Sequence, residues 1–363
     1  MKKVFIAVTN DLITDFRIQK IATTLKKSGF FVLLIGRYKN TESYKYTPDF
    51  NCFRFRLLFN TGPLFYFLYN VRLLNYLIFN KFDIIVSNDL DTLPACFLAA
   101  KIKNKALVYD SHELFTEVPE LVNRKFVKYI WTVLEKIFLP RVSTSYTVCE
   151  SISTYYNRKY ARNMQVILNA APFLSENIGV KRYSNVILYQ GAVNIARGLE
   201  LIIDTLEINR NLIFWIVGQG DILSQLKSRV IMKKLRDRVL FFNRQTPEQL
   251  RFITPKASVG VSVEANTGLS YYYALPNKLF DYIQARIPVL VSNFPEMAGV
   301  VTKYQIGMVL TDRSINSTAR ILNYMVTNTE ARNIWLTNLN KAANDMNWEN
   351  EEKKIQAIFT NLS

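Results

Sequence analysis

Histidine is almost absent from this sequence of 363 residues, because His112 is the only one. A zinc site built from three histidines or from an HExxH motif is therefore excluded, and a Ser-His-Asp triad can form only around this position. Imidazole is the side chain whose ordinary pKa lies near neutrality. His112 follows an apolar, strand-like run, and open α/β sheets bind ligands at the ends of such strands. A purely structural role, as a cap of the following helix, is the alternative.

Cysteine and long apolar runs are also scarce. The three cysteines, Cys52, Cys96 and Cys149, are far apart and form no CxxC pair. A disulfide framework or a cysteine metal site is therefore not indicated, and we expect a cytoplasmic protein. No stretch reaches the roughly 18 uninterrupted apolar residues that a membrane span requires. We expect a chain that does not cross a bilayer.

Acidic residues are outnumbered, with 29 Asp and Glu against 46 Lys and Arg, which gives a net charge of +17. This excess predicts an anionic partner, either phospholipid or nucleic acid. Because no RNP, KH or zinc-finger pattern accompanies the basic residues, we expect no nucleic acid. Residues 124–141 mix five basic residues with aromatic and aliphatic ones, which is typical of a helix at an anionic membrane surface. A similar run covers 53–82, and for both runs ordinary core helices with a basic solvated face are the alternative.

Short apolar runs alternate with helical patterns along the whole chain. This alternation predicts an α/β protein with two Rossmann-like, doubly wound domains that face each other across a cleft. We expect the domains at 1–170 and 171–340, followed by a C-terminal helix at 341–363 that packs back on the first domain. The predicted strands are 4–8, 31–35, 82–87, 106–109 and 145–149, then 185–189, 212–217, 239–242, 259–263, 289–292 and 308–310.

Glycine-containing loops follow the strands of the second half. The first strand lacks a GxGxxG loop, which argues against a dinucleotide site of the dehydrogenase type. Gly191 and Gly218 each end a predicted strand, and Arg197 with Gly198 opens a predicted helix. Flexible backbone and the N–H groups of a helix start are suited to holding an anion.

The most specific stretch is 276–292, where a helix begins at Pro276 or Asn277 and ends before a buried strand. Lys278 and Asp281 lie one turn apart on the same face of this helix. We interpret the stretch as a diphosphate site made of N–H groups and a lysine, with a carboxylate nearby to accept hydrogen bonds from ribose hydroxyls.

Together with Gly191, Arg197-Gly198 and the segments 217–220 and 110–114, this stretch resembles the GT-B-fold, retaining nucleotide-sugar glycosyltransferases of family 4. The resemblance covers nearly the whole chain and is strongest from about 186 to 310. It implies that the first domain binds the acceptor and the second binds the nucleotide sugar. The implied donor-binding residues are Gly191, Arg197, Gly218, Glu264, Asn277, Lys278 and Asp281.

Two positions depart from the family pattern. Asp281 matches the second of two glutamates that the family spaces eight positions apart, but Tyr273 stands where the first belongs, so Glu264 is the candidate replacement for the sugar contact. Arg197 matches the lysine of the family's basic pair, whereas Ala192 occupies the place of the arginine. Lys278 is the candidate for the missing cation.

The resemblance also gives His112 a catalytic role, in which it orients sugar hydroxyls and stabilises developing charge rather than acting as a base. In this family, retention is explained by a same-face mechanism in which the leaving phosphate takes up the acceptor proton. Asp110 either orients His112 or caps a helix. Asp15 and Arg17 are expected to reach the acceptor or the diphosphate.

The pair Asp89 and Asp91 forms a DxD motif, which we interpret as helix capping rather than as a metal site. We expect neither a metal nor any other cofactor.

The sequence thus predicts a peripheral membrane enzyme that transfers a hexose from a nucleoside diphosphate sugar to a lipid-linked glycan in bacterial surface polysaccharide assembly. Two alternatives remain open. A nucleotide-sugar 2-epimerase of the same fold would require more acid-base groups than one histidine supplies. A degenerate module that binds glycans or membranes is kept open by Tyr273 and Ala192.

Overall fold

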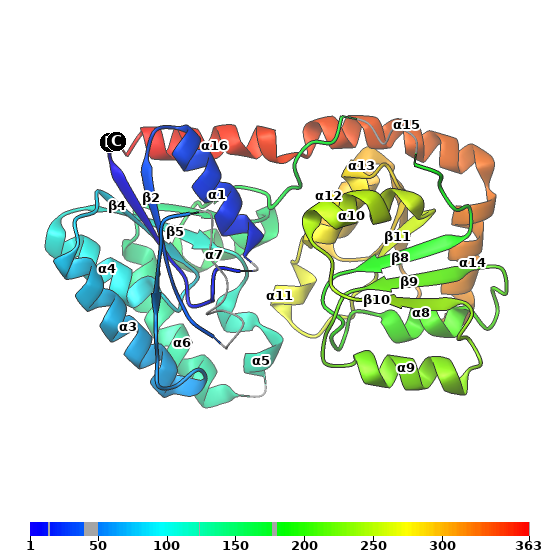
Figure 1. Cartoon of the computed structure of the whole chain (residues 1–363), viewed down its shortest axis with the longest axis horizontal. Coiled ribbons are helices and arrows are strands. Elements are labelled where there is room, and N and C mark those ends of the chain that lie inside the picture. Colours follow the sequence, from blue (N-terminus) through cyan, green and yellow to red (C-terminus); the bar gives the residue numbers. More distant parts are fainter. Residues whose placement is uncertain (14, 40–49, 123, 176–179, 363) are drawn as a thin grey trace. The chain divides into compact units, whose positions relative to one another are not determined.

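The computed structural model describes residues 1–13, 15–39, 50–122, 124–175 and 180–362, and it separates into two compact units (Figure 1). Unit 1 consists of Met1–Asn169 and Glu351–Ser363, and unit 2 consists of Ala170–Asn350. The helix expected from residue 341 begins only at Trp348, because the preceding helix continues to Asp345. Residues 341–350 consequently belong to unit 2.

Unit 1 contains a parallel sheet in the order β3-β2-β1-β4-β5-β6-β7. Its strands are β1 (Lys3–Ala7), β2 (Phe31–Arg37), β3 (Cys52–Phe55), β4 (Ile84–Asn88), β5 (Ala106–Ser111), β6 (Thr144–Thr147) and β7 (Gln165–Val166). Every residue of β4 is buried, as expected for a central parallel strand that is covered on both faces. The edge strands β3 and β7 were not predicted from the sequence.

Helices cover both faces of this sheet (Figure 1), with α1 and α16 on one face and α3, α4 and α6 on the other. The helices are α1 (Phe16–Lys27), α3 (Gly62–Phe79), α4 (Leu93–Lys103), α5 (Pro119–Val122), α6 (Lys125–Phe138), α7 (Glu150–Tyr160) and α16 (Trp348–Thr360). Helix α16 packs through Phe359, whose ring centroid lies 6.3 Å from that of Phe30.

Unit 2 contains a second parallel sheet in the order β10-β9-β8-β11-β12-β13. Its strands are β8 (Val186–Gln190), β9 (Ile213–Val217), β10 (Val239–Phe242), β11 (Val259–Ser262), β12 (Val289–Ser292) and β13 (Gly307–Leu310). The chain order reverses between β8 and β11, which are neighbours in the sheet. Ligands of doubly wound sheets bind beyond the carboxyl ends of the strands at such a reversal.

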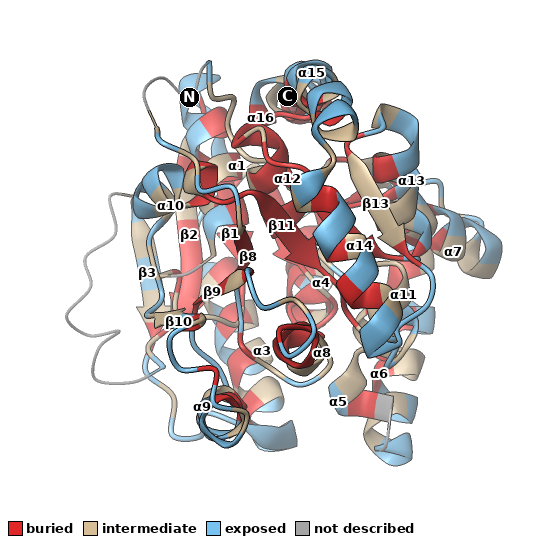
Figure 2. Cartoon of the chain, turned by 90° about the vertical axis from the view of Figure 1, so that its right-hand side faces the viewer, coloured by how far each residue is buried: buried red, intermediate tan, exposed pale blue. Residues whose placement is uncertain are grey.

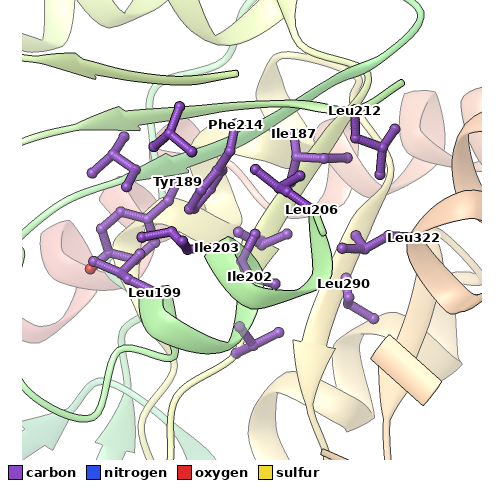
Figure 3. Packing of buried hydrophobic residues seen from close by; sticks show 14 of the residues in the cluster. Ile187, Tyr189, Leu199, Ile202, Ile203, Leu206, Leu212, Phe214, Leu290 and Leu322 are labelled. Atoms are coloured by element: carbon purple, nitrogen blue, oxygen red, sulfur yellow. The ribbon is translucent and has the colours of Figure 1, made fainter. Parts of the chain in front are cut away.

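The helices of unit 2 are α8 (Leu199–Thr205), α9 (Leu223–Met232), α10 (Pro247–Ile253), α11 (Leu269–Tyr272), α12 (Asn277–Gln284), α13 (Pro295–Tyr304), α14 (Ile315–Thr327) and α15 (Thr329–Asp345). Leu199 and Ile202 of α8, and Leu206 directly after it, pack on strand residues such as Phe214 (Figure 3). Strands β8 and β11 are buried, whereas the helices expose their outer faces (Figure 2). Both units are thus Rossmann-like α/β layers.

Candidate active site

Glycines bring the loops after β8 and β9 into direct contact. A Cβ atom added to Gly218 would lie 1.9 Å from the carbonyl oxygen of Gly191, closer than any side chain allows. Both glycines have positive φ angles, 131° at Gly191 and 153° at Gly218. Only glycine therefore permits this approach, and the backbone of two strand ends is gathered in one place.

A buried carboxylate lies at the end of the neighbouring strand, β11. Glu264 is 3% exposed, and its Oε1 atom lies 2.7 Å from Nζ of Lys278 and 3.8 Å from Nη1 of Arg197. Its Oε2 atom accepts a hydrogen bond of 2.9 Å from Oγ of Ser262. Burial alone would raise the pKa of Glu264, but Lys278 and Arg197 together hold it below its usual value. Glu264 is therefore ionised.

Two cations share this one carboxylate, so the cluster carries an excess positive charge. Nζ of Lys278 lies 4.2 Å from the ring centroid of Tyr189, and the guanidinium of Arg197 lies 4.8 Å from that of Tyr271. Nε of Arg197 is buried and has no hydrogen-bond partner among the residues that the structure describes. A buried donor without a partner is costly, and this arrangement favours binding of an anion.

Helix α12 begins beside the same cations. Its N-cap is Pro276, which makes no side-chain cap hydrogen bond, and its first residue, Asn277, is exposed. The first N–H groups of a helix lack internal partners and carry partial positive charge. The start of α12 therefore adds backbone donors next to Lys278.

The last strand residue, Gln190, connects β8 to Asp281 of the same helix. Its Nε2 atom donates a hydrogen bond of 2.8 Å to Oδ2 of Asp281, and its Oε1 atom accepts one of 2.7 Å from Oγ1 of Thr254. Lys278 contacts the ring of Tyr189, the residue before Gln190. Lys278 and Asp281, predicted to share one helix face, thus contact consecutive residues at the end of β8.

Arg313 fixes the loop that carries Glu264, although no sequence pattern predicts this role. Its Nη1 and Nη2 atoms donate to the carbonyl oxygens of Glu264 at 3.0 Å and of Val263 at 3.1 Å. Ser292 donates a further hydrogen bond of 2.6 Å to the carbonyl of Glu264. An arginine 49 positions away from its partner leaves no local sequence signal.

In unit 1, His112 lies directly after β5, with its ring between two carboxylates. Nε2 lies 3.1 Å from Oδ2 of Asp110, and Nδ1 lies 3.6 Å from Oδ2 of Asp89. The backbone N–H of His112 also donates to Oδ1 of Asp89 at 2.9 Å. The ring contacts these carboxylates rather than capping a helix, so Asp110 orients His112.

The carboxylates determine the charge of the imidazole. Burial disfavours the charged ring, but Asp110 and Asp89 outweigh it and raise the pKa of His112 to about 10. Burial also raises the pKa of Asp89, to about 7, despite the nearby His112. At neutral pH His112 is therefore a cation, which can stabilise negative charge but has no capacity to accept a proton.

The structure contradicts the expected contact of Arg17 with the acceptor or the diphosphate. It is 3% exposed, and its Nη2 and Nε atoms donate to Asp110 at 2.9 and 3.2 Å. The neighbouring Asp15 caps α1 by accepting from the N–H of Ile18 at 3.2 Å. Arg17 is thus a buried partner of Asp110 and not a contact for the acceptor or the diphosphate.

The capping role predicted for the DxD pair is also wrong. The N-cap of α4 is Thr92, which makes no side-chain cap hydrogen bond. Asp89 instead contacts His112, and Oδ2 of Asp91 accepts a hydrogen bond of 2.5 Å from Oγ1 of Thr9. Within the part of the chain that the structure describes, no group of three or more His, Cys, Asp or Glu residues is arranged to hold a metal ion.

Helix α6, which lies in the basic segment 124–141, exposes apolar side chains. Phe126 is 75% exposed and Tyr129 is 66% exposed, and the basic residues Lys125 and Lys136 are exposed as well. Trp131 is buried on the other side of the helix. None of the described helices combines the length and the apolar character that crossing a membrane requires.

Solved structures share the fold of this chain over its whole length. Sucrose-phosphate synthase from Thermosynechococcus elongatus has a TM-score of 0.81 at 14% sequence identity, with 100% of this chain and 99% of that chain covered. Anabaena Alr3699/HepE, solved in complex with UDP-glucose, has a TM-score of 0.77 at 14% identity, with coverage of 99% and 100%. WaaG, a glycosyltransferase involved in lipopolysaccharide biosynthesis, has a TM-score of 0.66 at 14% identity, with coverage of 98% and 99%. The two Rossmann-like units therefore form a GT-B fold.

Family models match both units in chain order. The model described as Glycosyltransferase Family 4 matches residues 17–171, and the model described as Glycosyl transferases group 1 matches residues 172–342. The chain belongs to the GT-B glycosyltransferases of family 4. No curated protein sequence matches it.

Proposed function

We propose that this glycosyltransferase transfers a hexose from a nucleoside diphosphate sugar to a glycan acceptor, with retention of the anomeric configuration. The observation that carries the proposal is the cation pair, Lys278 and Arg197, gathered on one buried carboxylate at the start of α12. A diphosphate is the anion that matches two cations and a row of N–H donors.

In this proposal the diphosphate contacts Lys278, Arg197 and the N–H groups at Asn277. Gly191 and Gly218 let the backbone approach it, because neither presents a side chain. Asp281 accepts hydrogen bonds from the ribose. The complex of Anabaena Alr3699/HepE with UDP-glucose supports a nucleotide-sugar donor for a chain of this fold.

Glu264 was expected from the sequence to contact the donor sugar. Both of its carboxylate oxygens already have partners, with Oε1 2.7 Å from Nζ of Lys278 and Oε2 2.9 Å from Oγ of Ser262. We therefore assign Glu264 to holding the two cations in position. Tyr273 still occupies the place of the first family glutamate, and the sugar contact is unassigned.

The reaction follows from the chemistry of the donor. The bond between the anomeric carbon and the diphosphate oxygen breaks, and the acceptor oxygen bonds to the same face of the sugar. The acceptor proton passes to the leaving diphosphate, so no side-chain nucleophile is needed. The raised pKa of His112, about 10, supports a role as a cation that orients hydroxyls and stabilises charge.

We further propose that the acceptor is linked to a lipid and that the enzyme works at the cytoplasmic face of an anionic membrane, in surface polysaccharide assembly. The exposed Phe126 and Tyr129 of α6, with Lys125 and Lys136 on the same helix, support this location. Apolar side chains that enter the headgroup region and lysines that reach phosphate bind anionic bilayers together.

A thermal stability screen with UDP, GDP, ADP and CMP tests the donor assignment. We expect one of them to raise the melting temperature, because a ligand that binds only the folded state stabilises it. No shift with any of them would contradict the donor assignment and favour a binding module. Analysis of the products with the matching nucleotide sugar then separates transfer from 2-epimerisation, which would return an epimerised nucleotide sugar.

Binding to liposomes tests the membrane assignment. We expect Phe126→Ser to weaken binding to vesicles that contain anionic lipid, and Phe252→Ser, which removes a phenylalanine 69% exposed on α10 of unit 2, to leave it unchanged. High salt should also weaken binding, because it screens charges at the surface. Equal effects of the two variants, or binding that persists in high salt without anionic lipid, would contradict the assignment.

A further inference from the structure

Gln190 is a buried polar residue that the proposed reaction does not use. It is the last residue of β8, its side chain is 2% exposed, and it directly precedes Gly191. A buried amide needs partners for its donor and acceptor atoms. Gln190 finds both in side chains, namely Asp281 and Thr254.

The two hydrogen bonds fix the orientation of the amide. Nε2 faces Oδ2 of Asp281 at 2.8 Å, while Oε1 accepts from Oγ1 of Thr254 at 2.7 Å. A flipped amide would turn its oxygen toward the Asp281 carboxylate, where two acceptors would repel each other. Thr254 is itself 2% exposed, so the bonding partner on the far side of the amide is held by packing.

The same contact fixes the Asp281 carboxylate. Helix α12 is anchored to the end of β8 by the neighbouring residue, Tyr282, whose hydroxyl accepts from the N–H of Gln190 at 3.2 Å. An amide donor orients a carboxylate without neutralising it, whereas a lysine would compensate its charge and a glutamate would repel it. A glutamine at position 190 therefore orients Asp281 without supplying a counter-charge, which suits a carboxylate that accepts hydrogen bonds from hydroxyl groups.

We propose that Gln190 is a positioning residue that directs the Asp281 carboxylate to the ribose of the donor nucleotide and so makes the site select ribonucleotides over 2′-deoxyribonucleotides. The inference rests on the ribose role given to Asp281 in the proposed function. This selection distinguishes positioning from a purely structural role, because replacing a glutamine with only a structural role would weaken the binding of both kinds of nucleotide equally.

Calorimetric titration with UDP and 2′-deoxy-UDP, and with GDP and 2′-deoxy-GDP, tests this selection. The wild-type protein should bind one ribonucleotide about tenfold more tightly than its deoxy form, the ratio that one hydrogen bond to a charged group provides. Gln190→Leu should bring this ratio close to one by weakening the ribonucleotide, while affinity for the deoxy form changes by less than about twofold. Thr254→Val is a milder change that should reduce the ratio in part. It replaces Gln190→Leu in this test if that variant does not fold.

Two further variants separate positioning from general damage. Gln284→Leu removes another buried glutamine of α12, which donates to the carbonyls of Ala343 and Met346, and it should keep the wild-type ratio. Asp281→Asn should lose the ratio, and adding Gln190→Leu to it should cause no further loss, because the two residues act through one contact.

The outcomes distinguish the inference from the function on which it rests. A ratio that persists in Gln190→Leu and Thr254→Val but disappears in Asp281→Asn would overturn the positioning role and leave the ribose role intact. Equal wild-type affinity for both forms would overturn the contact with the 2′-hydroxyl and the inference with it, whereas no nucleotide binding would overturn the proposed function itself.

Discussion

The charge of His112 is open to a direct test, since no other histidine in the sequence contributes a signal. A change in pH removes or adds the proton of its ring. The structure raises the pKa of this residue from 6.5 to about 10, against the cost of burial, through Asp110 and Asp89. At roughly 1.4 kcal/mol per pKa unit, this shift amounts to about 5 kcal/mol in favour of the protonated ring.

The assay is a carbon NMR titration of untagged protein labelled at the Cε1 atom of histidine. We expect one resonance that keeps the imidazolium position from pH 6 to 8, apart from a small shift as Asp89 ionises near pH 7, and that moves to the neutral position only as the pH approaches 10. Asp89→Asn should lower the pKa of His112, because one of the two carboxylates at the ring, 3.6 Å from Nδ1, is then neutral. A resonance that titrates near pH 6.5 in the wild type would refute the assignment of a cationic His112.

The raised pKa of His112 also makes the free energy of unfolding depend on pH. The folded state keeps a proton that the unfolded state loses above pH 6.5, so the stabilisation is complete below that pH and is lost as the pH rises to about 10. Chemical denaturation should record this as a loss of about 1.4 kcal/mol per pH unit between pH 7 and 9. Stability that is independent of pH in this range would contradict the shift.

Two substitutions test other parts of the account. His112→Ala should lower the transfer rate by about a hundredfold, measured with the donor that the nucleotide screen selects, while nucleotide affinity in calorimetry stays nearly unchanged. Equal losses of transfer rate and nucleotide affinity would show that His112 has only a structural role. Gly218→Ala should lower the free energy of unfolding by more than about 2 kcal/mol, because its Cβ atom would lie 1.9 Å from the oxygen of Gly191. Its control is Gly299→Ala in α13, where an added Cβ meets no atom of the described residues within 4 Å. This variant should gain about 0.5–1 kcal/mol in denaturation experiments, and a Gly218→Ala variant as stable as this control would contradict the close approach.

Most strands of both sheets could be predicted because central parallel strands are buried on both faces and are therefore apolar throughout. The run at Val289–Ser292 matches β12 at both ends, and Val239–Phe242 matches β10, an edge strand that is apolar throughout. The two edge strands of the first sheet lack this signal. Strand β7 has only two residues, Gln165 and Val166, and β3 contains Arg54 within an aromatic run that favoured a different interpretation.

The candidate site was predictable where its residues follow the ends of strands or begin a helix. Gly191, Gly218 and Lys278 are found this way, since the fold brings such positions to one edge of a sheet. Pairings across long sequence separations were not predictable. Arg17 reaches Asp110 over 93 positions, and nothing in the local pattern distinguishes a buried partner of a carboxylate from a free contact for substrate.

We propose above that Lys278 and Arg197 hold the diphosphate of the donor, and calorimetry is the direct test of this contact. The nucleoside diphosphate that stabilises the wild type is titrated into Lys278→Ala, Arg197→Ala and, as a control, Lys233→Ala, which removes a lysine of the same unit paired with Asp204. We expect each of the first two variants to lose about tenfold or more in affinity and Lys233→Ala to bind like the wild type. Unchanged affinity in both Lys278→Ala and Arg197→Ala would contradict it.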